Sequence, residues 1–426
     1  MKRILPMALM SLAALPAAAE NRIDVIRPDA PALAAYGDYK VGVQTMTFTN
    51  MGQVDVAQTQ ADGDIPTYDR PLTVEIWYPA AADTAAGGSY QAMMRDGTDV
   101  TLQGQAVRDA AALTGETFPL VIISHGYPGN RWLLGHLGEN LASKGYVVAS
   151  IDHTDSNYDD MGNFGSTLYN RPWDQKFVID SMESLDGDLG AITDASNTAV
   201  VGYSMGGYGA LILAGAGLTE AITSSDYAPP QGLLERNVMG SDTHAELEDD
   251  RIKAFAAFGP WGNNRGFWDA DGLAGIDKPL LLIAGSVDDV SEYDAIRGIF
   301  DGAVNSDRHL LTYLNANHNA GAPMPSPEEG YAINETLGWA PFEHYGDAVW
   351  DNVRMNNIAQ HFVTAWVDQN LKGADMSEYF DLTPNAADGV WAVDDAGEPT
   401  QDNTYWNGFA NRTAVGLTFE SMPAGE

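Results

Sequence analysis

One serine in the sequence stands in a pattern that suits nucleophilic catalysis. Residues 199–207 are Ala-Val-Val-Gly-Tyr-Ser-Met-Gly-Gly, so Ser204 is the centre of a G-x-S-x-G motif that follows a short apolar run. Such a serine sits on a sharp turn between a strand and a helix, where side chains in place of the two glycines would collide with their surroundings. We therefore predict that Ser204 is a nucleophile held exposed at the edge of a sheet, with the start of a helix beside it to stabilise a developing oxyanion.

A serine nucleophile needs a base that takes its proton and a carboxylate that orients the base. When the serine stands between a strand and a helix, the order along the chain is serine, acid, histidine. Asp288 and Asp289 follow the buried run 280–283, and His318 follows the next apolar run, 310–314. We predict that His318 is the general base and Asp288 its orienting acid, with Asp289 as the rival acid. The other seven of the eight histidines fit this order less well.

An oxyanion also needs two backbone N–H donors, one from the residue after the nucleophile and one from the loop after an early strand. Met205 supplies the first. Residues 124–129 form a glycine-rich turn after a buried run, and the N–H of Tyr127 is the predicted second donor, with an ordinary strand-to-helix turn as the alternative. Tyr127, Tyr203 and Trp261 could also line an acyl or alcohol pocket, although packing in the core would explain each equally well.

The elements that must position these residues alternate between strands and helices. Continuous Val, Ile and Leu runs indicate strands that are buried on both faces, as in a parallel sheet covered by helices. The predicted strands are 120–123, 147–151, 199–201, 252–258, 280–283 and 310–314, and the predicted helices are 132–144, 172–185, 207–214 and 353–371. Two earlier segments, 41–48 and 72–78, alternate between apolar and polar residues and are predicted to be neighbouring antiparallel strands. The predicted fold class is α/β, with a mostly parallel central sheet flanked by helices.

Two long segments interrupt this alternation. Residues 217–250 are polar and end in an acidic run, whereas residues 323–350 are rich in Pro, Gly and aromatic residues. Each follows a predicted catalytic residue and is longer than an ordinary connection, so we predict that both are lid-like insertions in a single domain spanning residues 20–426. The tail from residue 373 onward is rich in turns but carries large aromatic residues, so we expect it to pack on this domain.

Composition excludes several classes of function. The chain has 426 residues, of which 45% are hydrophobic, and its 59 Asp and Glu outnumber its 22 Lys and Arg to give a net charge of -37. A surface this negative repels nucleic acid and anionic membranes. The chain contains no cysteine, which excludes thiolate chemistry and disulfides. We find no motif for a metal, a dinucleotide or a P-loop, and the acidic turns 269–272 and 394–397 are better explained as solvated turns than as weak calcium sites, so no cofactor is expected.

The first residues predict export. Lys2 and Arg3 precede an apolar run at 4–15, and Ala17-Ala18-Ala19 form a small-residue cleavage site. A membrane anchor would need about 20 apolar residues, more than this run contains. We therefore predict that residues 1–19 are a signal peptide, that the mature protein is periplasmic or secreted, and that it does not associate with the membrane after cleavage.

Several segments carry a resemblance to a known family. Ser124-His125-Gly126, the segment 141–148, Asp152-His153, Arg171-Pro172 and the serine motif occur in the order seen in the α/β-hydrolase superfamily. The chain resembles in particular the exported bacterial proteins described as predicted dienelactone hydrolases, which are related to platelet-activating-factor acetylhydrolase. Dienelactone hydrolases proper use a cysteine nucleophile, whereas this chain has Ser204 in its place. The resemblance therefore implies a serine carboxylesterase that works through an acyl-enzyme without a cofactor.

A second resemblance is to bacterial cutinase-type polyesterases, in which residues 204–207, Pro260-Trp261, Asp288 and His318 have counterparts. It makes polyesters an alternative class of substrate, although two lids would close the open cleft that a polymer needs. A hydrolase-fold binding protein without catalysis is a further alternative, but such proteins usually lack members of the triad. The leading prediction is hydrolysis of small or medium carboxylic esters.

Overall fold

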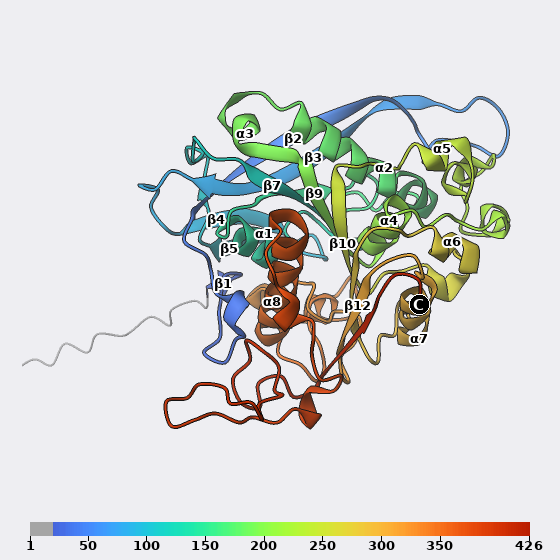
Figure 1. Ribbon diagram of the computed structural model, residues 1–426. Helices are drawn as coiled ribbons and strands as arrows, with labels where there is room; N and C mark the ends of the chain where they lie inside the picture. The colour runs from blue at the N-terminus through green and yellow to red at the C-terminus, as the bar shows by residue number, and fades with distance from the viewer. Residues whose placement is uncertain (1–19) are drawn as a thin grey trace, which may run out of the picture.

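A mixed sheet of ten strands forms the centre of the computed structural model, which describes residues 20–426 (Figure 1). The predicted signal peptide, residues 1–19, lies outside the described residues. The strand order is β13-β12-β11-β10-β9-β7-β8-β3-β2-β6. The strands are β2 (Lys40–Val54), β3 (Thr67–Ala80), β6 (Val107–Arg108), β7 (Phe118–Ser124), β8 (Val147–Asp152), β9 (Thr193–Tyr203), β10 (Ile252–Phe258), β11 (Leu280–Gly285), β12 (Arg308–Tyr313) and β13 (Leu417–Met422).

The neighbouring strands from β8 through β7, β9, β10 and β11 to β12 pair in parallel. These are the continuous apolar runs of the sequence, and burial on both faces is the reason for their composition. The two alternating segments form β2 and β3, which pair antiparallel along most of their length. The predicted α/β class with a mostly parallel sheet is confirmed, and the parallel strands bring the carboxyl ends of β7, β9, β10, β11 and β12 to one edge.

Helices cover both faces of the sheet (Figure 1). Helices α1 (Gly135–Ala142) and α8 (Asn352–Lys372) contribute to the apolar core on one face, whereas α2 (Phe164–Glu183), α4 (Met205–Leu213), α6 (Ala270–Ala274) and α7 (Tyr293–Gly302) contribute to the core on the other. Two short helices, α3 (Gly187–Ile192) and α5 (Asp242–Ala245), complete the set of α-helices in residues 20–426. Within that range no helix is both long enough and apolar enough to cross a membrane.

Helix α2 corrects the sequence prediction. It begins at Phe164 rather than near residue 172, and Pro172 lies inside it. The side chain of Asn163 accepts a hydrogen bond from the N–H of Gly165, which caps the helix at its true start. The sequence prediction missed this start because it treated the proline as the beginning of the helix. Helix α7 was not predicted at all, although it packs against β11 and β12.

Smaller elements complete the described chain. Strands β1 (Asn21–Arg22), β4 (Gly88–Met93) and β5 (Asp99–Gly104) form a separate sheet of three strands. The tail supplies β13, which pairs antiparallel with β12, and its Phe419 is 2% exposed. The tail therefore packs on the domain and extends the main sheet.

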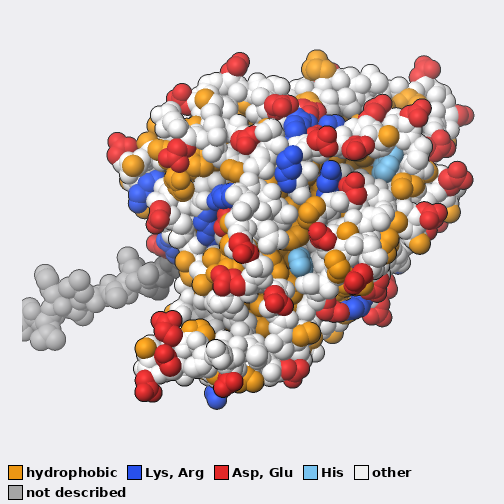
Figure 2. All heavy atoms as spheres, in the orientation of Figure 1, with side chains coloured by type: hydrophobic (Ala, Val, Ile, Leu, Met, Phe, Trp, Pro, Cys, Tyr) orange, Lys and Arg blue, Asp and Glu red, His pale blue; other side chains and the backbone are white. Residues whose placement is uncertain are grey.

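The insertion at 217–250 contains α5 and two 3-10 helices, η2 (Glu220–Ser224) and η3 (Leu233–Asn237). The insertion at 323–350 contains the 3-10 helices η5 (Glu328–Tyr331) and η6 (Pro341–His344). The remaining 3-10 helices are η1 (Ala32–Ala34), η4 (Asn263–Arg265), η7 (Ser377–Tyr379) and η8 (Ala386–Asp388). On the face shown in Figure 2, Asp and Glu side chains are spread widely over the surface, as the composition requires.

Candidate active site

Ser204 lies at a sharp turn between β9 and α4. Its backbone has φ 54° and ψ -112°, a left-handed conformation that costs free energy in a residue with a side chain. A Cβ atom at Gly202 would lie 2.2 Å from the carbonyl oxygen of Gly206, and one at Gly206 would lie 1.9 Å from the carbonyl oxygen of Ser124. Both glycines are therefore required by close approach of backbone to backbone.

The expectation that Ser204 is exposed needs correction. The residue is only 6% exposed, because loops at this edge of the sheet enclose it. It nevertheless lines a cavity of about 260 Å³, so its side chain adjoins space that a small molecule can enter. Its backbone is held by the end of β10 and the loop after it, since its N–H donates to the carbonyl of Phe258 and its carbonyl accepts from the N–H of Trp261.

His318 and Asp288 form a hydrogen-bonded pair at the same edge. Nδ1 of His318 lies 2.8 Å from Oδ2 of Asp288, and Oδ1 of Asp288 accepts hydrogen bonds from the N–H groups of Val290 and Ser291. Burial raises the pKa of the Asp288 carboxyl, but these hydrogen bonds outweigh it and hold the pKa below its ordinary value. Asp289 is exposed. The structure thus joins Asp288, and not its neighbour, to the imidazole.

Gly259 supports this pair and was missed by sequence reasoning. It follows β10 with φ 47°, and a Cβ atom there would lie 3.1 Å from Nδ1 of His318 and 3.2 Å from Oδ2 of Asp288. Its carbonyl accepts a hydrogen bond from the hydroxyl of buried Ser291. A glycine directly after a buried strand that follows the serine motif is the signal that could have pointed to it.

His318 lines the same cavity as Ser204. Its ring lies against the ring of Tyr203, with centroids 5.2 Å apart. Within residues 20–426, no hydrogen bond joins the Ser204 hydroxyl to the imidazole. Hydrogen bonds between catalytic groups are often long before substrate binds, so this geometry is compatible with proton transfer in a complex.

The two predicted oxyanion donors come from the residue after the serine and from the loop after β7. Met205 is the first residue of α4, and Tyr127 lines the cavity in the loop after β7. In the described part of the chain, neither N–H has a hydrogen-bond acceptor. The loop approaches the serine closely, because a Cβ atom at Gly126 would lie 3.3 Å from Cβ of Ser204. Both N–H groups thus lack an acceptor within the described residues, and Tyr127 lines the cavity whereas Met205 is not among the cavity-lining residues.

The two remaining predicted pocket residues differ in position. Tyr203 lines the cavity, and its hydroxyl donates to Oδ1 of Asn319 at 2.9 Å. Trp261 is not among the cavity-lining residues. It lies in an aromatic cluster with Phe164 and Tyr227, and the ring of Phe164 also contacts that of Tyr127 at 5.2 Å. An aromatic row therefore extends from the cavity to Trp261.

The two segments predicted to be insertions are placed differently around the site. Glu343 and His344 of the 323–350 segment line the cavity, and neither was predicted as a site residue. The 217–250 segment contributes Tyr227 to the aromatic row, while its later residues lie at the other end of the sheet. Among residues 20–426, no group of three or more His, Asp or Glu side chains is arranged to hold a metal ion.

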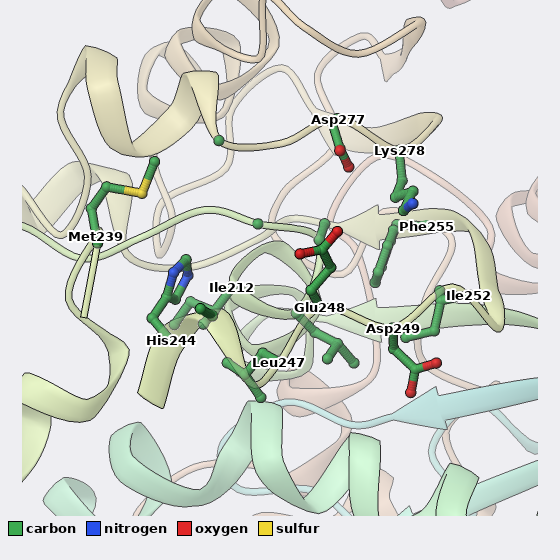
Figure 3. A pocket seen from close by; sticks show the side chains of 16 residues that line it. Ile212, Met239, His244, Leu247, Glu248, Asp249, Ile252, Phe255, Asp277 and Lys278 are labelled. Atoms are coloured by element: carbon green, nitrogen blue, oxygen red, sulfur yellow. The ribbon is translucent and has the colours of Figure 1, made fainter. Parts of the chain in front are cut away.

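A second cavity, of about 340 Å³, lies at the amino ends of β10 and β11 (Figure 3). Met239, His244, Glu248 and Phe255 are among the residues around it. Because Ser204 lies at the carboxyl end of β9, this cavity and the serine lie at opposite ends of the parallel strands.

Comparisons with known proteins agree with this architecture. A family model described as PET hydrolase-like matches residues 84–229. The chain is 28% identical to cutinase est1 of Thermobifida alba over 206 residues, which are 48% of this chain and 54% of that cutinase. It is 39% identical to platelet-activating factor acetylhydrolase of Bos taurus over 64 residues, 15% of this chain and 13% of the relative.

Among solved structures, a ferulic acid esterase from Streptomyces cinnamoneus matches with a TM-score of 0.54 and 21% identity, covering 84% of this chain and 94% of the esterase. At this identity the match shows the fold, which is that of an α/β-hydrolase. The resemblance to α/β-hydrolases related to cutinases and platelet-activating factor acetylhydrolases is confirmed. The match spans about half the length of the first cutinase relative.

The contact between Gly206 and Ser124 yields a prediction about stability. Gly206→Ala should lower the free energy of unfolding by about 1–3 kcal/mol or more, because the new methyl group would push β7 away from α4. Urea unfolding followed by circular dichroism measures the change. Gly298→Ala in α7 is the control, since the only close neighbour of its methyl group would be the end of the Asn263 side chain. Equal stability of the two variants would show that the turn tolerates a side chain.

Proposed function

We propose that the protein is a serine hydrolase that cleaves carboxylic esters through an acyl-enzyme. The observation that carries this proposal is the convergence of Ser204, the His318–Asp288 pair and the free N–H of Tyr127 on one cavity. The relatives support it, because the proteins that the chain resembles are cutinases, platelet-activating factor acetylhydrolases and a ferulic acid esterase.

In the first half-reaction, Oγ of Ser204 attacks the ester carbonyl carbon while Nε2 of His318 takes the hydroxyl proton. The carbonyl oxygen becomes an oxyanion, which accepts hydrogen bonds from the N–H groups of Met205 and Tyr127. Asp288 holds His318 with Nδ1 protonated and stabilises the imidazolium that forms. When the carbon–oxygen bond of the ester breaks, His318 returns the proton to the departing alcohol and the acyl group remains on Ser204.

In the second half-reaction, water takes the place of the alcohol. His318 removes a proton from the water as its oxygen attacks the acyl carbon, and the same two N–H groups hold the oxyanion. Collapse of this intermediate breaks the bond to Oγ, returns the proton to Ser204 and releases the carboxylic acid. No step requires a cofactor.

The cavity supports small or medium esters as substrates. Its volume of about 260 Å³ lies just below the range of about 300–1,000 Å³ that is usual for small-molecule sites. Glu343 and His344 of the 323–350 insertion line it, which favours a short group at this position. We further propose that residues 1–19 direct export to the periplasm or the medium, as the basic and apolar pattern of this segment suggests.

A polyesterase is the second candidate function. The PET hydrolase-like family match over residues 84–229 and the cutinase relatives favour it. The aromatic row from Tyr127 to Trp261 could accommodate successive units of a polymer outside the cavity. Because an insertion lines the cavity, we expect soluble p-nitrophenyl esters of short acids to be cleaved with a higher kcat/KM than those of long acids, and a polyester film to release little product.

Measurement of kcat/KM over a series of acyl lengths, together with acid release from an aromatic and an aliphatic polyester film, separates the two candidates. Sustained film hydrolysis at rates comparable with those on soluble esters would favour the polyesterase. A steep fall in kcat/KM with acyl length would favour the small-ester hydrolase.

The nucleophile is tested with Ser204→Ala. The variant should lose about 10⁶-fold in kcat on a p-nitrophenyl ester, because no other group can form the acyl-enzyme. It should keep the thermal unfolding profile of the parent, and a fluorophosphonate should label the parent but not the variant. Retention of hydrolysis in a folded variant would remove Ser204 from the mechanism, and a parent without hydrolysis or labelling would instead support a binding protein.

The acid is tested with Asp288→Asn against Asp289→Asn. Both variants remove one negative charge, but only Asp288 is hydrogen-bonded to His318. Asp288→Asn should lower kcat by roughly 10⁴-fold, since the amide favours the wrong tautomer of the imidazole. Asp289→Asn should cause a far smaller loss. Steady-state kinetics measure both, and the reverse ranking would assign the role to Asp289.

A further inference from the structure

His125 is the first residue after β7, at the start of the proposed oxyanion loop. It is fully buried, and Nδ1 of its ring lies 2.7 Å from the carbonyl oxygen of Gly126. On the other side of the ring, Nε2 accepts a hydrogen bond from the backbone N–H of His153 at 3.2 Å. The ring therefore joins the loop after β7 to the chain just beyond β8. The serine, its base and its acid do not involve this residue.

The partners of His125 determine where its proton resides. The N–H of His153 can only donate, so Nε2 of His125 must carry a lone pair. The carbonyl of Gly126 can only accept, so Nδ1 must carry the proton. Burial, together with the nearby Arg171 and His153, lowers the pKa of the His125 imidazole well below its ordinary value, which keeps the ring neutral. The Nδ1-protonated neutral tautomer is the form that satisfies both contacts.

The hydrogen bond between Nδ1 of His125 and the carbonyl of Gly126 determines the direction of the Tyr127 N–H, the proposed oxyanion donor. The peptide bond between Gly126 and Tyr127 is planar and trans, so its C=O and N–H point in opposite directions. Because the carbonyl points back to His125, the N–H of Tyr127 points away from the buried ring. Gly126 and Tyr127 line the same cavity as Ser204, so this N–H lies on a peptide that borders the cavity.

The surroundings of His125 are themselves fixed. Nη1 of buried Arg171 donates to the carbonyl of His125 at 2.7 Å, so the two successive carbonyls of the loop both have donors. A Cβ atom at Gly129 would lie 2.6 Å from Nδ1 of His125, which leaves the ring little room to rotate.

The ring of His153 is also held in place. Its Nδ1 lies 2.9 Å from Oδ2 of Asp174, whose carboxylate is paired with Arg70. The backbone N–H that contacts His125 thus belongs to a residue with restricted freedom.

We propose that His125 is a positioning residue for catalysis, whose Nδ1–H orients the Gly126–Tyr127 peptide so that the N–H of Tyr127 faces the oxyanion. This inference rests on the proposed ester hydrolysis. It predicts that the hydrogen bond from His125 to Gly126 stabilises the transition state and has little effect on substrate binding, because the ester carbonyl gains full negative charge only during reaction.

Two variants separate positioning from a general structural role. Asn in place of His125 keeps a donor near the position of Nδ1 but loses the acceptor for the His153 N–H. Gln keeps an acceptor near the position of Nε2 but loses the donor to Gly126. Each variant thus removes one hydrogen bond from the same buried site, and only His125→Gln releases the Gly126 carbonyl.

We expect His125→Gln to lower kcat on a p-nitrophenyl ester by roughly 10–100-fold, a part of the 10²–10³-fold that loss of an entire oxyanion donor costs. KM should change by less than about threefold, since the ground-state carbonyl depends little on this donor. His125→Asn should retain most of the parent kcat. Thermal unfolding of each variant, compared with the parent, sets a temperature at which all three proteins are folded.

A kcat of His125→Gln within twofold of the parent would overturn the proposal, as would equal losses in both folded variants. Nitrogen NMR of the parent labelled with ¹⁵N-histidine tests the tautomer without any assay of activity. The signal of His125 is the one that disappears in His125→Asn. We expect it to report a neutral ring with the proton on Nδ1, and a proton on Nε2 would overturn the proposal. A parent that hydrolyses no ester but has the expected tautomer would contradict the proposed function and leave the orientation of the peptide supported.

Discussion

The close packing of backbone around Ser204 is the constraint on which the rest of the site depends. The serine has a left-handed conformation, its N–H and carbonyl are hydrogen-bonded to the end of β10 and to the loop after it, and two glycines allow β7, β9 and α4 to meet there. Hydrogen bonds and packing from the surrounding strands, helix and loop stabilise this turn and offset the free-energy cost of its backbone conformation. The backbone of Ser204 is therefore held in a fixed position relative to His318 and Tyr127.

The parallel sheet brings residues that are far apart along the chain close together in space. Asp288 follows β11, His318 follows β12 and Gly259 follows β10, so that adjacent strands deliver the proposed acid, the proposed base and the backbone that packs against both. Because the carboxyl ends of parallel strands lie at one edge of the sheet, residues that are far apart in the sequence meet there. The loop that carries Tyr127 follows β7, on the other side of β9 from β10, so Ser204 lies between the strands that carry the proposed acid and base and the strand that carries this proposed donor.

The sequence was sufficient to predict the parallel strands, because continuous apolar runs are a strong local pattern, and the glycine-bounded serine indicated the turn at which Ser204 lies. It did not predict the start of α2, where the cap at Asn163 matters more than the proline inside the helix. The choice between Asp288 and Asp289 depends on the direction of a side chain after a turn, which spacing alone does not determine. The sequence did not indicate the positions of Gly259 and His344 beside the cavity and the His318–Asp288 pair, because these positions arise from contacts between distant loops.

The hydrogen bond between Tyr203 and Asn319 has a consequence for how this scaffold can diversify. Asn319 adjoins His318 in sequence, and its amide also donates to the carbonyl of Gly346 in the 323–350 insertion. The loop that carries the imidazole is therefore anchored both to the strand before the serine and to the segment that walls the cavity. If the chain hydrolyses esters as proposed, shortening this segment to admit bulkier esters would also remove an anchor of the imidazole, so substrate range and turnover would change together.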